Sequence, residues 1–228
     1  MTLTKRLSLI ASLVPENSNV CDVGTDHAYL PIMLIKSKKA RRVIATDIRP
    51  LPLENARKNI ALSGVVGIET RLCDGLSSVK KSEADTVIIA GIGGEVISGI
   101  IKRTGWLKLS PPVLLILQPT TSPEILRRYL CENGFEISDE TAVEENGKVY
   151  SVIRAVYTGK IICCPDWFYY IGKTDLSAPD GRLYAEKQYN RLFSCASALQ
   201  NLPEKKSEYK YYADAAAQIG NLLKKSEN

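Results

Sequence analysis

The chain has 228 residues, of which 45% are hydrophobic and 24% are charged, and its formal net charge is +5. This length suits one domain with an appendage or two small domains, and the hydrophobic content is sufficient for a buried core. No apolar run approaches the ~20 residues that a membrane-spanning helix needs, so we expect no membrane partner. The positive charge is compatible with a polyanionic partner but does not demand one, because nucleic-acid-binding modules usually concentrate charge more strongly.

The first residues and the cysteines both indicate a cytoplasmic protein. Residues 1–16 hold a charged pair followed by apolar residues at helical spacing, too interrupted for a signal peptide, so we expect a helix there. Six cysteines occur without a C-x-x-C pair, and His27 is the one histidine, so a zinc site would need thiolates at spacings that are absent. We therefore expect free thiols and no metal, and the role of the vicinal Cys163 and Cys164 stays open.

Short apolar runs alternate with helical stretches from residue 19 to residue 157. The apolar runs predict strands at 19–24, 41–48, 67–75, 85–94 and 112–119. Helical patterns cover 27–37, 51–64 and 122–134, and the last of these begins with Ser-Pro and ends at a glycine. Residues 135–157 predict two strands joined at Asn146-Gly147, which is a hairpin signal.

The sequence changes in character after Thr158. Residues 163–182 are aromatic and rich in turn formers, so we expect a connector that packs against the sheet domain. Residues 183–202 and 204–225 each carry one apolar stripe at helical spacing, and Pro203 separates them. These features predict a helical hairpin held together by its stripes, with a domain boundary between residues 1–159 and residues 160–228.

Alternating strands and helices predict a mostly parallel sheet with helices on both faces. Five such strands followed by an antiparallel hairpin are typical of the Rossmann-like class I methyltransferases rather than of a dinucleotide domain with six parallel strands. We therefore predict an α/β fold of this class, followed by a small C-terminal α-helical hairpin domain.

Acidic residues stand where three of the predicted strands end, which is where open parallel sheets bind ligands. Asp22 and Gly24 follow the first strand, and Gly24 permits a tight turn. Asp47 ends the second strand, where a carboxylate can bind both hydroxyls of a ribose. Asp74 ends the third strand and can accept a hydrogen bond from an adenine amino group. Small residues at 90–94 let a ligand approach the backbone of the fourth strand.

These residues describe an adenosine ligand without phosphates. Asp26, His27 and Ala28 occupy positions that are glycines in the dinucleotide fingerprint. S-adenosylmethionine carries a sulfonium and an amino acid where NAD carries a pyrophosphate. Nearby carboxylates attract the positively charged sulfonium and repel the negatively charged pyrophosphate. We expect S-adenosylmethionine, with S-adenosylhomocysteine as its product, to be bound by Asp22, Gly24, Asp47, Ile48, Cys73, Asp74, Gly75, Ala90 and Gly91.

Four segments resemble those of the bacterial tRNA (adenine(22)-N(1))-methyltransferases: DVGTDHAYLP at 22–31, AGIGG at 90–94, LQP at 117–119 and EENGKVY at 144–150. The resemblance runs from Lys5 to Tyr157 and extends to the C-terminal hairpin in helix content more than in residues. It implies a class I fold, S-adenosylmethionine as methyl donor, and N1 of an adenine in the tRNA D-arm as acceptor. Thr25 and Ile92 depart from the family, in which serine and methionine are common there.

The resemblance places Asp26, His27 and Tyr29 between the cofactor and the target base. N1 of adenine is neutral and has an in-plane lone pair, so the enzyme has to position the base and accommodate the positive charge that forms. Asp26 either accepts a hydrogen bond from the N6 amino group or caps the helix that follows. His27 acts at the cofactor edge or makes structural hydrogen bonds, and Tyr29 stacks on a flipped adenine or packs under the loop.

Enzymes that methylate exocyclic amines have an Asn-Pro-Pro-aromatic motif where this chain has Gln118-Pro119 followed by two threonines, which favours a ring nitrogen as the target. Gln118 either binds the base edge or only ends its strand. We expect tRNA to be contacted by Gly93, Gly94, Lys102, Arg103, Gln118, Pro119, Arg127 and Arg128, with the C-terminal hairpin aiding by shape.

Two alternatives stay open at this point. The first is that the chain is a class I methyltransferase that acts on another RNA, a protein or a small molecule. The second is that it is a non-catalytic relative that only binds RNA. No obligate protein partner is evident, and the sequence does not settle which tRNAs are modified or the oligomeric state.

Overall fold

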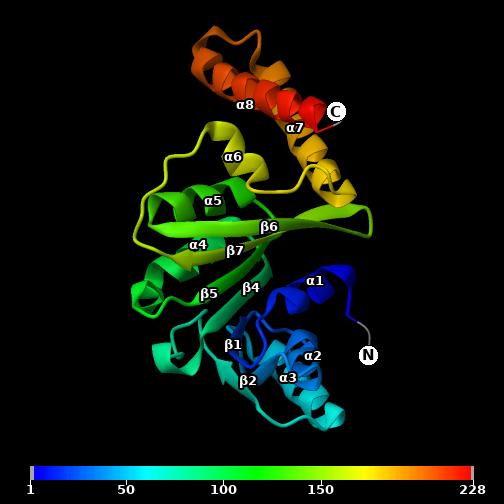
Figure 1. Ribbon diagram of the computed structural model, residues 1–228, viewed down its shortest axis with the longest axis vertical. Coiled ribbons are helices and arrows are strands. Elements are labelled where there is room, and N and C mark those ends of the chain that lie inside the picture. Colours follow the sequence, from blue (N-terminus) through cyan, green and yellow to red (C-terminus); the bar gives the residue numbers. More distant parts are fainter. Residues whose placement is uncertain (1–2, 227–228) are drawn as a thin grey trace.

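The computed structural model describes residues 3–226 and contains one seven-stranded sheet in the order β3-β2-β1-β4-β5-β7-β6 (Figure 1). The first five strands are parallel, and β7 runs antiparallel to both β5 and β6. The strands are β1 (Ser18–Val23), β2 (Ala40–Asp47), β3 (Ile68–Leu72), β4 (Thr86–Ile92), β5 (Leu114–Pro119), β6 (Phe135–Glu145) and β7 (Lys148–Tyr157). This arrangement confirms the predicted class I sheet with its antiparallel hairpin.

Helices cover both faces of the sheet. They are α1 (Lys5–Leu13), α2 (Tyr29–Lys36), α3 (Pro50–Ser63), α4 (Gly94–Arg103), α5 (Pro123–Glu132), α6 (Asp166–Ile171), α7 (Pro179–Leu199) and α8 (Lys206–Lys225). Two of these helices lack a clear helical pattern in the sequence: α4, which begins inside the glycine run, and the six-residue α6 inside the aromatic connector. No helix within residues 3–226 is long and apolar enough to cross a bilayer.

Two hydrophobic clusters fill the space between the helices and the sheet. One lies under α4, α5 and α6 and the other under α1 and α2. The central strand β4 contributes to both, since Val87 and Ile89 pack on one side and Ile88 on the other. A strand buried on both faces explains the nearly continuous apolar run in its sequence.

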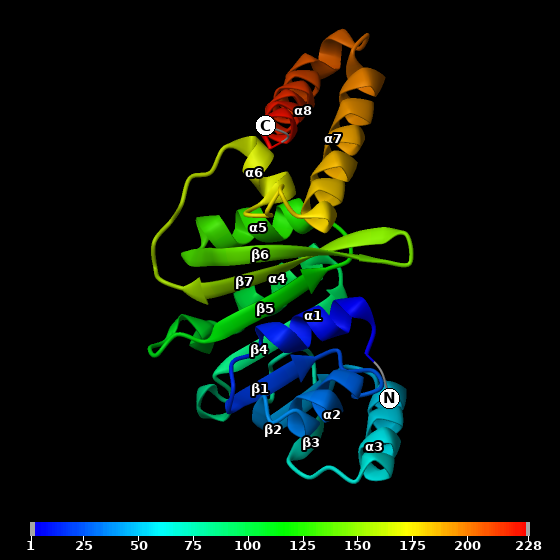
Figure 2. The same cartoon turned by 45° about the vertical axis from the view of Figure 1, so that its right-hand side comes forward.

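The last two helices form the predicted hairpin, which projects away from the sheet (Figure 2). Its apolar stripes meet in a separate cluster that includes Ala185 and Leu192 of α7 together with Ala216 and Ile219 of α8. The connector packs on the sheet domain as expected, with Phe168 and Tyr169 in the cluster under α5. We keep residue 159 as our proposed domain boundary, although the base of α7 also contacts β6 and β7.

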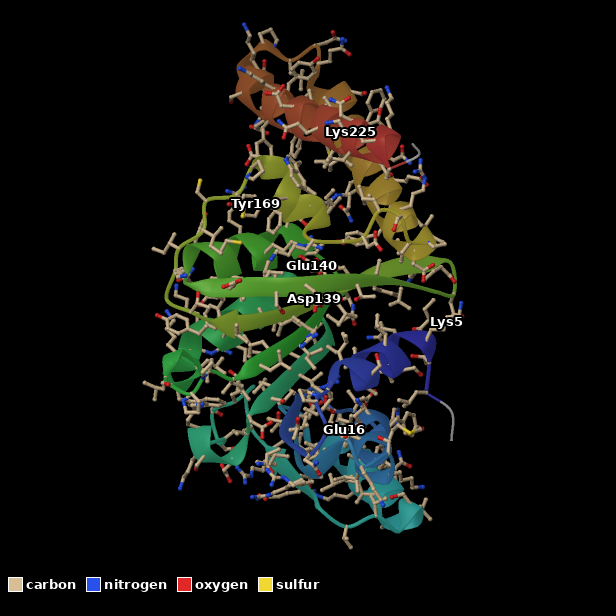
Figure 3. All side chains as sticks on the ribbon, viewed as in Figure 1. Lys5, Glu16, Asp139, Glu140, Tyr169 and Lys225 are labelled. Atoms are coloured by element: carbon tan, nitrogen blue, oxygen red, sulfur yellow. The ribbon has the colours of Figure 1, made fainter. Side chains whose placement is uncertain are left out.

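The fully buried side chain of Arg127 ties the two parts of the chain together. It is paired with Glu140 of β6, with 2.8 Å between Nη2 and Oε2. It also donates to the carbonyl oxygens of Tyr169 and Tyr170 at 2.9 Å and to the Tyr184 hydroxyl at 3.0 Å. Figure 3 marks Glu140 and Tyr169 at this junction. The expectation that Arg127 contacts tRNA is therefore wrong, because all its donors are directed into the protein.

We predict that Arg127→Met lowers the free energy of unfolding by about 3–5 kcal/mol, because it leaves the Glu140 carboxylate buried without its partner. Arg154→Met is the matched control, since the neighbouring Arg154–Asp139 pair on the same hairpin is partly exposed. That control loses less than about 1 kcal/mol. Urea unfolding measures both, and equal losses would contradict a structural role for the buried pair.

Candidate functional site

A cavity lies at the carboxyl ends of β1 and β4, where the strand order reverses. Ligands of open α/β sheets bind at this place, and the cavity volume of about 570 Å³ is within the range of small-molecule sites. The expected cofactor residues that line it are Asp22, Gly24, Asp47, Ile48, Asp74, Gly75, Ala90 and Gly91. Asp26, His27 and Tyr29 line it as well. Cys73 does not, and its thiol instead faces the Gly75 carbonyl oxygen at 3.5 Å.

Asp22 is a buried carboxylate at the base of this cavity. Only 5% of the residue is exposed, and within residues 3–226 no cationic side chain forms a salt bridge with it. Burial, with a smaller contribution from the Asp47 carboxylate, raises the pKa of Asp22 to about 6. A buried acid that lacks a cation in the protein is suited to bind a ligand ammonium group.

The loop between β1 and α2 turns sharply over the cavity. Gly24, Asp26 and Ala28 all have positive φ angles, of 80°, 44° and 56°. Such angles cost little for glycine but strain the other two residues. Asp26 is not the cap of α2, because the capping position is Ala28 and no side chain caps the first turn. This finding removes the capping alternative. The Asp26 side chain is partly exposed, and the residue lines the cavity.

Two aromatic rings lie beside Asp26. The rings of His27 and Tyr29 are stacked, with centroids 5.2 Å apart and planes inclined by 17°. His27 Nε2 is 3.6 Å from Asp26 Oδ2, and the backbone carbonyl of His27 accepts a hydrogen bond from Asn59 at 2.9 Å. The backbone is thus held by α3, while the side chains of the loop stay partly exposed and available to a ligand.

Gln118 is fully buried, so the expectation that it binds the base edge is not compatible with this structure. Its Oε1 accepts hydrogen bonds from Arg6 Nη1 and from the backbone N–H of Gly91 at 3.1 Å. Its Nε2 donates to the Pro119 carbonyl at 2.8 Å. Gly91, with φ of 81°, forms a bulge that shifts the register of β4 against β5. Gln118 therefore supports the cavity wall rather than a ligand.

The expected basic residues divide into two groups. Arg103 reaches the cavity edge, where its Nη2 lies 3.2 Å from both oxygens of Asp74, and Lys102 is exposed on the same helix. Arg128 is remote from the cavity, and its guanidinium lies 4.0 Å from the centroid of the Tyr169 ring and pairs with Asp166. Arg128 thus holds the connector, and these contacts occupy the side chain that we expect to reach tRNA.

Several lining residues escaped the sequence analysis. Arg6 of α1 and the exposed Val96 of α4 are among them, together with Arg49 beside Asp47. Glu145 accepts a hydrogen bond from the backbone N–H of Arg6 at 3.0 Å and so helps to anchor α1 to the β6–β7 hairpin. No local sequence pattern indicates that long-range contact. The position of Arg49, two residues after a strand-end acid, does indicate that it lies near the site.

Gly93 and Gly94 are not among the residues that line the cavity, so the structure places neither of them beside the cofactor. A side chain at Gly94 would overlap the carbonyl oxygen of Ser122, and one at Gly93 would lie 2.9 Å from Thr121 Oγ1. Both glycines therefore serve the close packing of the loop after β4 against the loop after β5.

We expect Gly94→Ala to lower the free energy of unfolding by about 1–3 kcal/mol, because the new methyl group has to displace the Ser122 backbone. Gly105→Ala is the control, since a methyl group there meets no atom within 4 Å and the φ angle is not positive. Thermal or urea unfolding compares the two variants. A Gly94→Ala protein as stable as the Gly105→Ala protein would show that the two loops are not tightly packed.

Comparisons with known proteins agree with this geometry. A family model described as a methyltransferase domain matches residues 3–153. The tRNA (adenine(22)-N(1))-methyltransferase of Bacillus subtilis strain 168 is 38% identical over 156 residues, which are 68% of this chain and 65% of that protein. The alignment thus covers just under two thirds of the relative's length.

Solved structures extend the similarity over nearly the whole chain. A Streptococcus pneumoniae protein, assigned provisionally as a tRNA (m1A22) methyltransferase, superimposes with a TM-score of 0.83 at 32% identity and covers 97% of this chain and 100% of its own. A structure of the same protein in complex with S-adenosyl-L-methionine gives a TM-score of 0.81 at 30% identity, with 97% and 100% coverage. The similarity therefore includes the C-terminal helices as well as the sheet.

Proposed function

We propose that this chain, which belongs to the family of bacterial tRNA (adenine(22)-N(1))-methyltransferases, transfers a methyl group from S-adenosylmethionine to N1 of adenine 22 in the D-arm of tRNA. The observation that carries the proposal is the cavity at the strand-order reversal, which joins three strand-end carboxylates to the exposed loop acid Asp26. A tRNA substrate also places the protein in the cytoplasm, in keeping with six cysteines that are all free.

The cavity residues fit S-adenosylmethionine. Asp22 supplies a buried carboxylate for the ammonium group, and Asp47 accepts from the Arg49 N–H through Oδ1 at 2.9 Å, which leaves Oδ2 for a ribose hydroxyl. Ile48 and Val96 expose apolar surface at the cavity, 63% and 55% of each residue, where an adenine ring can be covered. When bound, the cofactor supplies an electrophilic methyl group, and these residues bind and orient it.

The loop residues position the acceptor base. The stacked His27 and Tyr29 rings present flat aromatic surface beside the cavity, and a flipped adenine can stack on such a surface. The half-exposed Asp26 carboxylate accepts a hydrogen bond from the N6 amino group. Methylation at N1 makes the adenine cationic, so a carboxylate hydrogen-bonded to the N6 amino group stabilises the charge as it develops.

We predict that Asp26→Asn lowers kcat for tRNA methylation by about 100-fold, because the neutral amide cannot offset the charge that forms on the base. The dissociation constants of S-adenosylmethionine and tRNA stay within about twofold, since the loop backbone is unchanged. Glu16→Gln, in an exposed turn before β1, removes the same charge far from the site and keeps wild-type turnover. Near-wild-type turnover in Asp26→Asn would rule out the catalytic role.

The raised pKa of Asp22 leads to a pH-dependent cofactor affinity. With a pKa of about 6, Asp22 is mostly protonated at pH 5 and mostly ionised at pH 7, and only the ionised form attracts an ammonium group. We expect the dissociation constant of S-adenosylmethionine to fall about tenfold from pH 5 to pH 7. The Asp22→Asn variant binds S-adenosylmethionine more weakly, and its affinity does not change between pH 5 and pH 7. Calorimetry measures both proteins, and a flat wild-type profile would contradict the role of Asp22.

A further inference from the structure

A second cavity lies where the base of α7 meets the carboxyl end of β5. Its volume is about 460 Å³, and we call it the joint groove. Figure 2 shows α7 beginning over this end of the sheet. The groove is lined by the loop 119–123 after β5, by residues 149–151 of β7, and by Tyr184, Lys187, Gln188 and Arg191 of α7. It is therefore built from both parts of the chain.

Gln188 is a buried polar residue that the protein itself does not satisfy. Only 6% of the residue is exposed, and Oε1 has no hydrogen-bond partner within the described part of the chain. Leaving a buried polar group unpaired lowers the stability of the folded protein. Because Gln188 lines the groove, a rotation of its amide lets a bound molecule supply the missing hydrogen bond.

The charges around the groove favour an anion. Lys187 is exposed and has no acidic partner within residues 3–226. Arg191 pairs with Glu124, at 3.0 Å between Nη2 and Oε1, so these two charges offset each other. Thr120 and Thr121 place exposed hydroxyl-bearing residues on the facing loop. The positive charge and the hydroxyls suit a phosphate group, and the buried amide suits the polar edge of a ring attached to it.

The groove adjoins the cofactor cavity through one pair of side chains. Arg6 lines the cofactor cavity, and its guanidinium carbon lies 5.6 Å from the centroid of the Tyr150 ring, which lines the groove. Gln118 holds Arg6 in place, and the chain after Gln118 continues directly into the groove wall. A molecule in the groove therefore lies beside whatever occupies the mouth of the cofactor cavity.

We propose that the joint groove binds a nucleotide that flanks the target adenine in the tRNA, with Lys187 at its phosphate and the Gln188 amide at a polar edge of its base. The inference rests on the proposed function, because a flanking nucleotide is defined only when an adenine occupies the active site. It also gives α7 a specific task in substrate binding, namely to supply one wall of a subsite.

Gln188→Leu tests this proposal. The variant removes an unsatisfied buried carbonyl, so its free energy of unfolding stays at the wild-type value or rises. Its dissociation constant for unmodified tRNA rises about three- to tenfold, as the loss of one hydrogen bond predicts, while S-adenosylmethionine affinity is unchanged. Lys187→Gln gives a second tRNA-binding loss that does not depend on the packing of Gln188. Lys36→Gln, at the end of α2 and the opposite edge of the sheet, is the charge-matched control and binds tRNA normally.

Transcripts changed at each nucleotide next to the target adenine identify the ligand. If Gln188 contacts one flanking base, the effects of Gln188→Leu and of changing that base are non-additive. Additive effects at both neighbours, or unchanged tRNA affinity in Gln188→Leu and Lys187→Gln, would overturn the proposal. A separate assay measures methyl transfer by the wild-type protein. Absence of methyl transfer in that assay would refute the proposed function, whatever the tRNA dissociation constants are.

Discussion

The side-chain amide of Gln118 holds together the segments that close the cofactor cavity. It accepts from Arg6 of α1, which is 112 residues away in the chain, and from the bulge at Gly91 of β4. Since Gln118 has no exposure, breaking these bonds would leave its buried Oε1 acceptor without a partner. The bulge, the N-terminal helix and the edge of the joint groove therefore depend on one residue at the end of β5.

The active site is electrostatically unfavourable until it is occupied. Asp22 is buried near Asp47 and lacks a cationic partner in the described chain, so its ionised form opposes folding at neutral pH. A cationic cofactor removes this penalty, whereas a pyrophosphate would increase it. In the joint groove, the buried Gln188 Oε1 likewise has no hydrogen-bond partner in the described chain, and a ligand can supply one. In both places the protein tolerates a local cost that a ligand of complementary chemistry relieves.

The sequence was sufficient to predict the sheet, because period-two and period-3.6 patterns are local. The strand-end acids Asp22, Asp47 and Asp74 were predictable for the same reason, since parallel strands bring their carboxyl ends to one edge. The burial of Arg127 is not visible in the sequence, because its partner Glu140 lies 13 residues away and Tyr184 lies 57 residues away. Burial of a charge is decided by such distant contacts, which no local pattern shows.

We propose above all that the site methylates N1 of one tRNA adenine. The most direct measurement is to incubate unmodified tRNA with the protein and S-adenosylmethionine and then to map methylated nucleosides by mass spectrometry. We predict N1-methyladenosine at position 22 of the D-arm, and its loss when the target adenine is replaced. N6-methyladenosine, methylation at another position, or no incorporation into tRNA would contradict the account.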